Sequence, residues 1–250
     1  MTDLFDMTGK VAVVTGGSRG LGREMVLAFA QHGADVVIAS RKIDNCEAVA
    51  EEVRAIGRKA LPIAYHAASW SAADELADAA YAEFGHVEVL VNNAGMSPLY
   101  PSLDAITEDL YDKVMGVNLK GPFRLSANIG TRMMAGDGGS IIFVASTASQ
   151  RPSPNEVVYG AAKAGVNNLA YGMARTFGPK VRVNSIVPGP FLTDISKAWD
   201  LEDFAKRAKT AFALERGGEP HEIVGAALYF ASNAGSYSTG TTLNVDGGPR

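Results

Sequence analysis

The sequence predicts an α/β protein built on a doubly wound, seven-stranded parallel sheet flanked by helices. Seven short runs of mostly apolar residues alternate with helical patterns along the 250 residues, as expected for strands buried on both faces. A glycine-rich turn follows the first run, where open sheets of this class bind ligands. We find no internal repeat, low-complexity segment or linker, which favours a single domain over residues 1–250.

Composition points to small-molecule partners. The net charge of −4, with basic and acidic residues interspersed, gives no surface suited to nucleic acid or to a membrane. No segment approaches the roughly 18 apolar residues of a membrane span, and the start of the chain has no apolar signal region. The single cysteine, Cys46, excludes an internal disulfide and suits a reducing compartment, so we expect a cytoplasmic protein.

The first predicted strand, residues 11–14, leads into the turn TGGSRGLG at residues 15–22. A helical pattern that includes Leu21, Met25 and Phe29 begins inside this turn. A glycine loop between strand and helix lets backbone N–H groups approach a phosphate at the positive end of the helix. The spacing Gly-x-x-x-Gly-x-Gly departs from the general dinucleotide fingerprint, and a plain tight turn is the alternative interpretation.

The second predicted strand, residues 35–39, is followed by Ser40 and Arg41, where an NAD-binding protein would place a carboxylate for the ribose hydroxyls. With Arg19 in the glycine turn, Arg41 is suited to hold a 2′-phosphate through charge-assisted hydrogen bonds. We therefore expect NADP(H) to be preferred over NAD(H). Two solvated arginines at a helix start are the alternative.

The middle of the chain continues the alternation. Helices are predicted at residues 44–56 and from about Ser71, a plausible N-cap, to Phe84, and strands at residues 60–65 and 87–91. The fourth strand ends in Asn92-Asn93-Ala94-Gly95, and loops at this end of a doubly wound sheet line the ligand crevice.

A long helical stretch covers residues 107–134 and contains Asn118 and, four residues later, Pro122. Because proline has no N–H, the Asn118 carbonyl loses its helical donor and the helix should kink. That carbonyl is then available to a water or a ligand, unless the kink only fits the helix to its neighbours.

The fifth strand, residues 140–145, ends at Ser146, and a helix beginning near Val157 carries Tyr159 and Lys163 on one face. A neighbouring cation favours a phenolate, so Lys163 is expected to lower the pKa of Tyr159 towards neutrality and make it an acid–base group.

The sixth strand, residues 181–187, stops at Pro188-Gly189-Pro190. Residues 190–218, polar with scattered aromatic side chains, are expected to form a substrate loop with short helices. A helix at residues 220–231 and a strand at residues 241–245 complete the alternation.

These residues together resemble the classical subgroup of the short-chain dehydrogenase/reductase family, which has a Rossmann fold, and in particular its 3-oxoacyl-[acyl-carrier-protein] reductase-like members. The resemblance covers nearly the whole chain. It rests on the following motifs: the glycine turn, Asn92-Asn93-Ala94-Gly95, Asn118, Ser146 thirteen residues before Tyr159, Lys163, Pro188-Gly189 and Asn244-Val245-Asp246-Gly247-Gly248.

The resemblance implies hydride transfer between a nicotinamide and a carbonyl or secondary alcohol, with Asn118, Ser146, Tyr159 and Lys163 as the catalytic residues. Tyr159 would be the general acid or base, and Ser146 would hold the substrate oxygen. Lys163 would lower the tyrosine pKa and bind the nicotinamide ribose. Asn118 would hold a water of a proton relay through its carbonyl.

The resemblance also implies the remaining contacts and the assembly. Cofactor contacts are expected at Gly16, Ser18, Arg19, Gly20, Leu21, Gly22, Ser40, Arg41, Asn93, Ala94, Gly95, Tyr159, Lys163, Pro188, Gly189 and Thr193. Substrate contacts are expected at Ser146, Thr147, Gln150, Tyr159 and Phe191, with Met96 to Leu99 and Glu156 near them. The protein is expected to be a homotetramer, with residues 107–134 and 157–177 at one interface.

One departure from the family pattern stands after the third strand, where His66-Ala67 replaces an Asp-Val pair near the adenine. His66 either takes over that contact or is a plain loop residue. The four histidines have no metal-ligand spacing, and Ser146 lacks a hydrolase elbow, so neither chemistry is expected. A NAD-dependent alcohol dehydrogenase, a non-catalytic cofactor sensor and, more remotely, a methyltransferase remain as alternatives.

Overall fold

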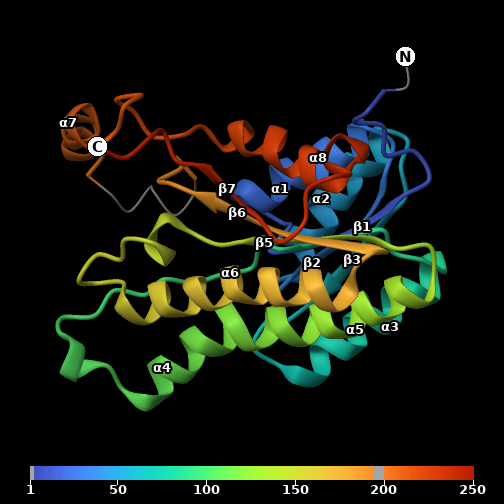
Figure 1. The fold of residues 1–250 in the computed structure, drawn as a ribbon, viewed down its shortest axis with the longest axis horizontal. Helices are drawn as coiled ribbons and strands as arrows, with labels where there is room; N and C mark the ends of the chain where they lie inside the picture. Colours follow the sequence, from blue (N-terminus) through green and yellow to red (C-terminus); the bar gives the residue numbers. More distant parts are fainter. Residues whose placement is uncertain (1–2, 194–199) are drawn as a thin grey trace.

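A parallel sheet of seven strands forms the middle layer of the molecule (Figure 1). The computed structural model describes residues 3–193 and 200–250. In chain order the strands are β1 Val11–Thr15, β2 Asp35–Ser40, β3 Ala60–Ala64, β4 Val89–Asn92, β5 Gly139–Val144, β6 Val181–Pro188 and β7 Thr242–Val245. Their order across the sheet is β3-β2-β1-β4-β5-β6-β7. The predicted doubly wound, seven-stranded α/β fold is confirmed.

Helices cover both faces of this sheet. One face carries α1 Gly20–Gln31, α2 Ile43–Ala55 and α8 Val224–Ala231, and the other carries α3 Trp70–Phe84, α5 Gly121–Ala135 and α6 Val157–Phe177. The shorter helices α4 Glu108–Met115 and α7 Leu201–Ala211 lie towards one end of the molecule in Figure 1. None of the helices in the described ranges is long and apolar enough to cross a membrane.

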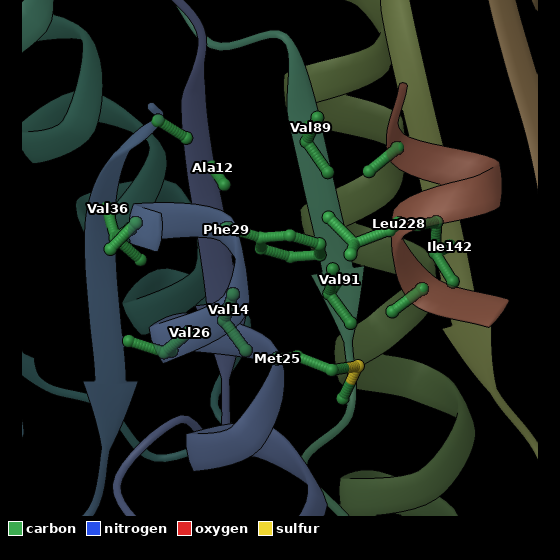
Figure 2. Close-up of a cluster of buried hydrophobic side chains, with 14 of the residues drawn as sticks. Ala12, Val14, Met25, Val26, Phe29, Val36, Val89, Val91, Ile142 and Leu228 are labelled. Atoms are coloured by element: carbon green, nitrogen blue, oxygen red, sulfur yellow. The ribbon is translucent and has the colours of Figure 1, made fainter. Parts of the chain in front are cut away.

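Strand residues alternate between two separate cores because successive side chains of a strand point to opposite faces. Ala12 and Val14 belong to the core under α1 and α8, shown in Figure 2, whereas Val11 and Val13 belong to the core under α3, α5 and α6. Each central strand therefore needs apolar residues at almost every position, which explains the continuous runs in the sequence. The edge strand β3 is less buried and tolerates Pro62.

The chain reverses direction across the sheet at β1. It runs outwards from β1 to β2 and β3, then returns to place β4 on the other side of β1. Loops after β1 and β4 therefore diverge and leave a crevice at the carboxyl ends of these strands. The glycine turn and the Asn92–Gly95 segment are those two loops.

Two helix predictions need correction. Helix α3 begins two residues earlier than expected, because Ser69 rather than Ser71 is the N-cap and its hydroxyl accepts the Ala72 N–H at 3.2 Å. The stretch 107–134 is not one helix: a π-helical turn, Gly116–Lys120, separates α4 from α5, and the Gly121 N–H donates to the Gly116 carbonyl. The irregularity expected near Asn118 and Pro122 lies in this turn.

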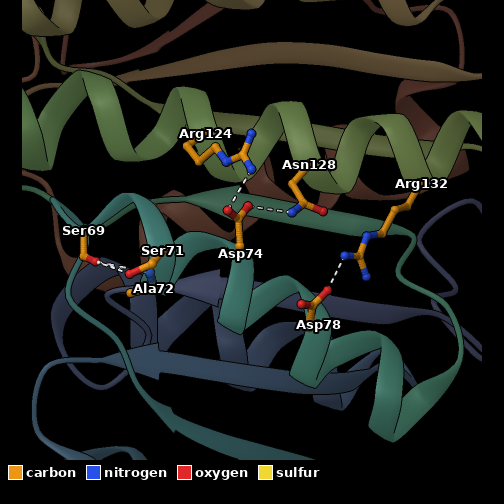
Figure 3. A network of polar contacts seen from close by, with 8 residues as sticks. All are labelled: Ser69, Ser71, Ala72, Asp74, Asp78, Arg124, Asn128 and Arg132. Carbon is orange, nitrogen blue, oxygen red and sulfur yellow. Dashed lines mark hydrogen bonds and ion pairs between the residues drawn. The ribbon is translucent and has the colours of Figure 1, made fainter.

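Helices α3 and α5 are joined by a polar network (Figure 3). Asp74 accepts hydrogen bonds from Arg124 at 2.7 Å and from Asn128 at 2.8 Å, and Arg132 pairs with Asp78 one turn further along. The hydrogen bonds from Arg124 and Asn128 lower the pKa of Asp74. The network holds α5 in register with α3.

Residues 190–218 form an excursion after β6. Isolated bridges pair Phe191 with Gly218 and Phe212 with Pro249, and α7 lies between them. Residues 194–199, which include part of the predicted substrate loop, lie outside the described residues.

Candidate active site

A cavity of about 780 Å³ opens at the carboxyl ends of the strands. Its lining begins at the glycine turn, passes the ends of β2 and β4, and reaches the start of α6 and the end of β6. The volume lies within the range of sites that enclose a cofactor or a drug-sized ligand.

The glycine turn is folded tightly against the loop after β4. Gly16 has a φ of +65°, and a Cβ added to it would lie 2.8 Å from the Asn93 amide nitrogen. A Cβ on Gly22 would lie 2.2 Å from the Gly16 carbonyl oxygen. The Asn93 side chain donates to the carbonyl of Thr15 at 2.9 Å. Glycine is thus required sterically at two positions, and the turn leaves its backbone accessible from the cavity.

The amino-terminal end of α1 fits an anionic group. Its N-cap residue, Arg19, makes no side-chain capping hydrogen bond, and the first turn contains no acidic residue. The N–H groups of the first turn have no intrahelical partner, and they lie at the positive end of the helix dipole. Residues of this turn line the cavity. Its free N–H groups and the positive end of the helix dipole are suited to bind the pyrophosphate of a dinucleotide.

Two exposed arginines flank the same end of the cavity. Arg19 and Arg41 both belong to the lining, together with Ser40 at the end of β2. In the described part of the chain neither guanidinium forms an ion pair with a carboxylate. Both charges are available to an anionic ligand. His66 also lines this region and is exposed.

At the other end of the cavity, Ser146, Tyr159 and Lys163 lie together. The Ser146 hydroxyl lies close enough to the Tyr159 phenol to influence its pKa. The Lys163 ammonium lies 5.7 Å from the centre of the Tyr159 ring and donates to the Val144 carbonyl at 2.6 Å. Ser146 is held in place by the Ala148 N–H, which donates to its hydroxyl at 3.1 Å. Strand β5 therefore supplies the serine, and α6 supplies the other two groups.

The protonation properties of this group differ from the expectation. Burial raises the pKa of Tyr159 to about 12, the nearby Ser146 hydroxyl acts in the opposite direction, and the Glu156 charge adds to the increase. Burial lowers the pKa of Lys163 to about 8. The expected lowering of the tyrosine pKa is therefore wrong for this structure, because burial disfavours the charged form of each group and is the largest influence on both pKa values.

Asn118 lies behind the cavity rather than in its lining. The side chain is completely buried: its amide nitrogen donates to Met96 and Val114 carbonyls at 2.8 and 2.9 Å, and its oxygen accepts the Met96 N–H at 3.2 Å. A Cβ added to Gly95 would lie 3.0 Å from the Asn118 amide oxygen and 3.5 Å from the Lys163 nitrogen. The π-helical turn, the loop after β4 and Lys163 thus meet at Gly95.

Most predicted site residues lie in the lining of this one cavity. Of the expected contact residues, Asn118 lies behind it, Ser18 is buried in the turn, and Gln150 instead forms hydrogen bonds of 3.3 Å with Asn244. Pro98 and Leu99, expected near the substrate, are also outside the lining. The lining also includes residues that sequence reasoning did not single out: Tyr65, Lys113, Val117, Ala148, Arg151, Pro152 and Ser153. The position of the loop after Ser146, at the end of a strand, indicated that it borders the site. The order of residues in the loop did not indicate which side chains face the cavity.

Across residues 3–193 and 200–250, no group of three or more His, Cys, Asp or Glu side chains is placed to hold a metal ion.

Comparison with known proteins agrees with this geometry. Residues 10–203 match the family model described as short chain dehydrogenase. The chain is 40% identical to an oxidoreductase of Mycobacterium tuberculosis over 98% of this chain and 94% of that protein. It is 38% identical to an L-rhamnose 1-dehydrogenase (NAD(P)(+)) of Azotobacter vinelandii, over 96% of each.

Among solved structures, the chain is similar to a 3-oxoacyl (acyl-carrier-protein) reductase from Agrobacterium tumefaciens with NADP bound. The TM-score is 0.93 at 32% identity, over 98% of this chain and 96% of that chain. The family match and the full-length relatives agree with the cavity and its glycine turn. The chain therefore belongs to the short-chain dehydrogenase/reductase family and is an oxidoreductase that acts on CH–OH groups with NAD(P).

Proposed function

We propose that this protein is an NADP(H)-dependent oxidoreductase that interconverts a secondary alcohol and a carbonyl compound, with Tyr159 as its general acid or base. One observation carries the proposal: Ser146, Tyr159 and Lys163 share a single cavity with a glycine turn whose helix end fits a phosphate.

When bound, the nicotinamide supplies or accepts the hydride. In reduction, Tyr159 gives its phenolic proton to the developing alkoxide, and in oxidation it takes the proton from the alcohol. Ser146, which lies near the phenol, holds the substrate oxygen beside it. Lys163 binds the ribose hydroxyls and stabilises the phenolate when it forms. The hydroxyl group of a bound alcohol would donate a hydrogen bond to the phenolate of Tyr159. This hydrogen bond would stabilise the charged form of the side chain.

Asn118 is proposed to act through its backbone. It lies in the π-helical turn four residues before Pro122, which has no N–H to donate to the Asn118 carbonyl. We assign this carbonyl to a bound water that connects Lys163 to solvent. The side chain of Asn118 anchors the turn to Met96 and does not enter the cavity.

The proposed preference for NADP(H) rests on Arg19 and Arg41. Both line the cavity at the end of β2, and neither is neutralised by a carboxylate among the described residues. A 2′-phosphate would gain charge-assisted hydrogen bonds there, whereas the 2′-hydroxyl of NAD would meet no acidic acceptor at Ser40 or Arg41. Ser18, Thr193 and the remaining residues of the glycine turn complete the proposed cofactor contacts.

For the substrate we propose a hydroxylated small molecule such as a sugar or polyol, with Thr147 and Phe191 near it. The named activity of the relative from Azotobacter vinelandii supports a sugar, and the polar side chains of the loop after Ser146 support a hydroxylated ligand. A homotetramer and a cytoplasmic location remain predictions from the sequence; light scattering of the purified protein tests the first.

The test is a panel of ketones, sugars and secondary alcohols assayed with NADPH, NADH and their oxidised forms. Replacement Tyr159→Phe removes the proton donor, and we expect at least about a hundredfold loss of kcat with NADPH affinity retained. A Tyr159→Phe protein as active as the parent would overturn the mechanism. Tight NADPH binding with no turnover of any substrate would instead favour a cofactor sensor.

A further inference from the structure

Glu156 is a half-buried carboxylate in the lining of the cavity, three residues before Tyr159. It occupies the N-cap position of α6, yet its side chain makes no capping hydrogen bond. Within the described residues its one side-chain hydrogen bond comes from the Ser153 hydroxyl at 2.8 Å. A carboxylate has about four acceptor sites. Glu156 therefore retains most of its acceptor capacity, and helix capping does not account for it.

The turn that carries Glu156 is fixed from two sides. The Tyr100 hydroxyl accepts the Val157 N–H at 2.8 Å and donates to the Pro154 carbonyl at 3.2 Å. The Glu156 N–H donates to the Ser153 carbonyl at 3.0 Å, and its own carbonyl accepts the Gly160 N–H at 2.6 Å. The position of the carboxylate relative to the catalytic helix is thus set before a substrate arrives, which is what selective recognition requires.

Glu156 also lies close to the reacting groups. Residues three apart are neighbours on a helix surface, with Cβ atoms about 5–6 Å apart. The Glu156 charge contributes to the raised pKa of Tyr159, as expected when a carboxylate is near a phenol. A substrate oxygen held by Ser146 and Tyr159 would therefore have its neighbouring carbons within reach of Glu156.

Besides Arg19, Arg41 and Lys163, two further cations line the same cavity. Lys113 is paired with Asp109 at 2.7 Å, whereas Arg151 is exposed and has no ion-pair partner among the described residues. A carboxylate on the substrate would be attracted by Arg151 and repelled by Glu156. A hydroxyl group suits both residues, because its oxygen accepts from a guanidinium and its proton is donated to a carboxylate.

We propose that Glu156 is a specificity-determining residue that accepts a hydrogen bond from a second hydroxyl group of the substrate, and thereby selects diols and sugars over mono-alcohols. This rests on the proposed function of the same cavity and names the substrate feature that the cavity recognises.

The experiment compares kcat/KM for 2,3-butanediol, 2-butanol and 2-hydroxybutanoate with NADP+, in the parent, Glu156→Gln, Glu156→Ala and Glu108→Gln. Glu108 is an exposed acid in the first turn of α4 and lies outside the cavity, so its replacement makes the same chemical change without the contact. The ratio of diol to mono-alcohol is the readout, because any effect of the lost charge on Tyr159 acts on both alcohols alike.

We expect the parent to favour the diol and both Glu156 variants to lower the ratio about tenfold, which corresponds to about 1.4 kcal/mol. Glu108→Gln should leave the ratio unchanged, and NADPH affinity should be retained in all variants.

An unchanged ratio of diol to mono-alcohol in the Glu156 variants overturns the proposal. The proposed function still stands in that case if the protein oxidises 2-butanol. A parent preference for 2-hydroxybutanoate over the diol also overturns the proposal, because Arg151 would then set the selectivity. Absence of turnover of all three refutes both this proposal and the alcohol activity on which it rests.

Discussion

Lys163 shows how burial changes the chemistry of a residue that the sequence identifies correctly. Its side chain is 4% exposed, and its ammonium donates to the Val144 carbonyl beside the Tyr159 ring. The spacing of Tyr159 and Lys163 predicted their proximity, but not that desolvation would dominate the pKa values of the partly buried phenol and the buried ammonium. The sign of a pKa shift depends on this balance, which cannot be obtained from helical spacing.

The lowered pKa of Lys163, about 8 against 10.5 for the free side chain, has a consequence for stability. Between these values the unfolded chain binds more protons than the folded one, so the free energy of unfolding rises with pH. From pH 7 to pH 9.5 we expect a gain of about 2 kcal/mol from this residue. Urea unfolding of the parent and of Lys163→Met measures it as the difference between two pH profiles.

The raised pKa of Tyr159 makes the free energy of unfolding fall with pH, because the tyrosine ionises in the unfolded chain before it does in the folded one. This effect begins only near about pH 10, so it does not affect the range from pH 7 to pH 9.5. Parallel profiles for the parent and Lys163→Met would show that the lysine keeps its ordinary pKa in the folded protein.

Arg41 carries the proposed cofactor preference, and Arg41→Asp is its test. Reversing the charge removes a phosphate partner and adds an acceptor for a ribose hydroxyl. We therefore expect the ratio of kcat/KM for NADPH to that for NADH to fall by about a hundredfold. Lys206→Asp, on exposed α7 outside the cavity, makes nearly the same charge change and should leave the ratio alone. If Arg41→Asp leaves the ratio at its parent value, the phosphate assignment is wrong.

At the scale of elements, the π-helical turn between α4 and α5 is the feature that most affects the site. Proline at position 122 predicted an irregularity, but its form depends on a loop far away in the sequence. Gly121 packs so closely on the loop after β3 that an added Cβ would lie 1.7 Å from the Ala67 carbonyl oxygen. A Cβ added to Gly116 would meet the neighbouring Ala68 less closely, at 3.0 Å from the Ala68 Cβ. Such contacts between distant segments are absent from any local pattern.

The close approach at Gly121 predicts a strong stability effect. In Gly121→Ala the backbone must move, which shifts the turn that holds Asn118, and we expect a loss of about 3 kcal/mol or more in the free energy of unfolding. Gly225→Ala on α8 is the matched control, because its Cβ would meet no atom within 4 Å. That variant should be unchanged or more stable by up to about 1 kcal/mol. Thermal and urea unfolding compare the two, and equal stabilities would contradict the packing described here.

At the scale of the whole molecule, the sequence predicted the fold more fully than the site. Apolar runs identified the central strands because a strand covered on both faces has little choice of residues, whereas the more exposed edge strands β3 and β7 were recognised from their place in the alternation. The glycine turn, Ser146, Tyr159 and Lys163 were found because their motifs are local. The position of Arg151 in the cavity lining and the pairing of Gln150 with Asn244 were not predicted. Both depend on how loops that are distant in the sequence pack against each other.

The central claim is that one cavity brings a nicotinamide and an alcohol or carbonyl carbon together for direct hydride transfer. The most direct measurement uses NADPH deuterated at the transferring position of the nicotinamide C4, an accepted ketone and mass spectrometry of the alcohol formed. We expect one deuterium on the carbinol carbon from the parent protein and almost no product from Tyr159→Phe. Alcohol formed without the label, or equal labelled product from both proteins, would contradict it.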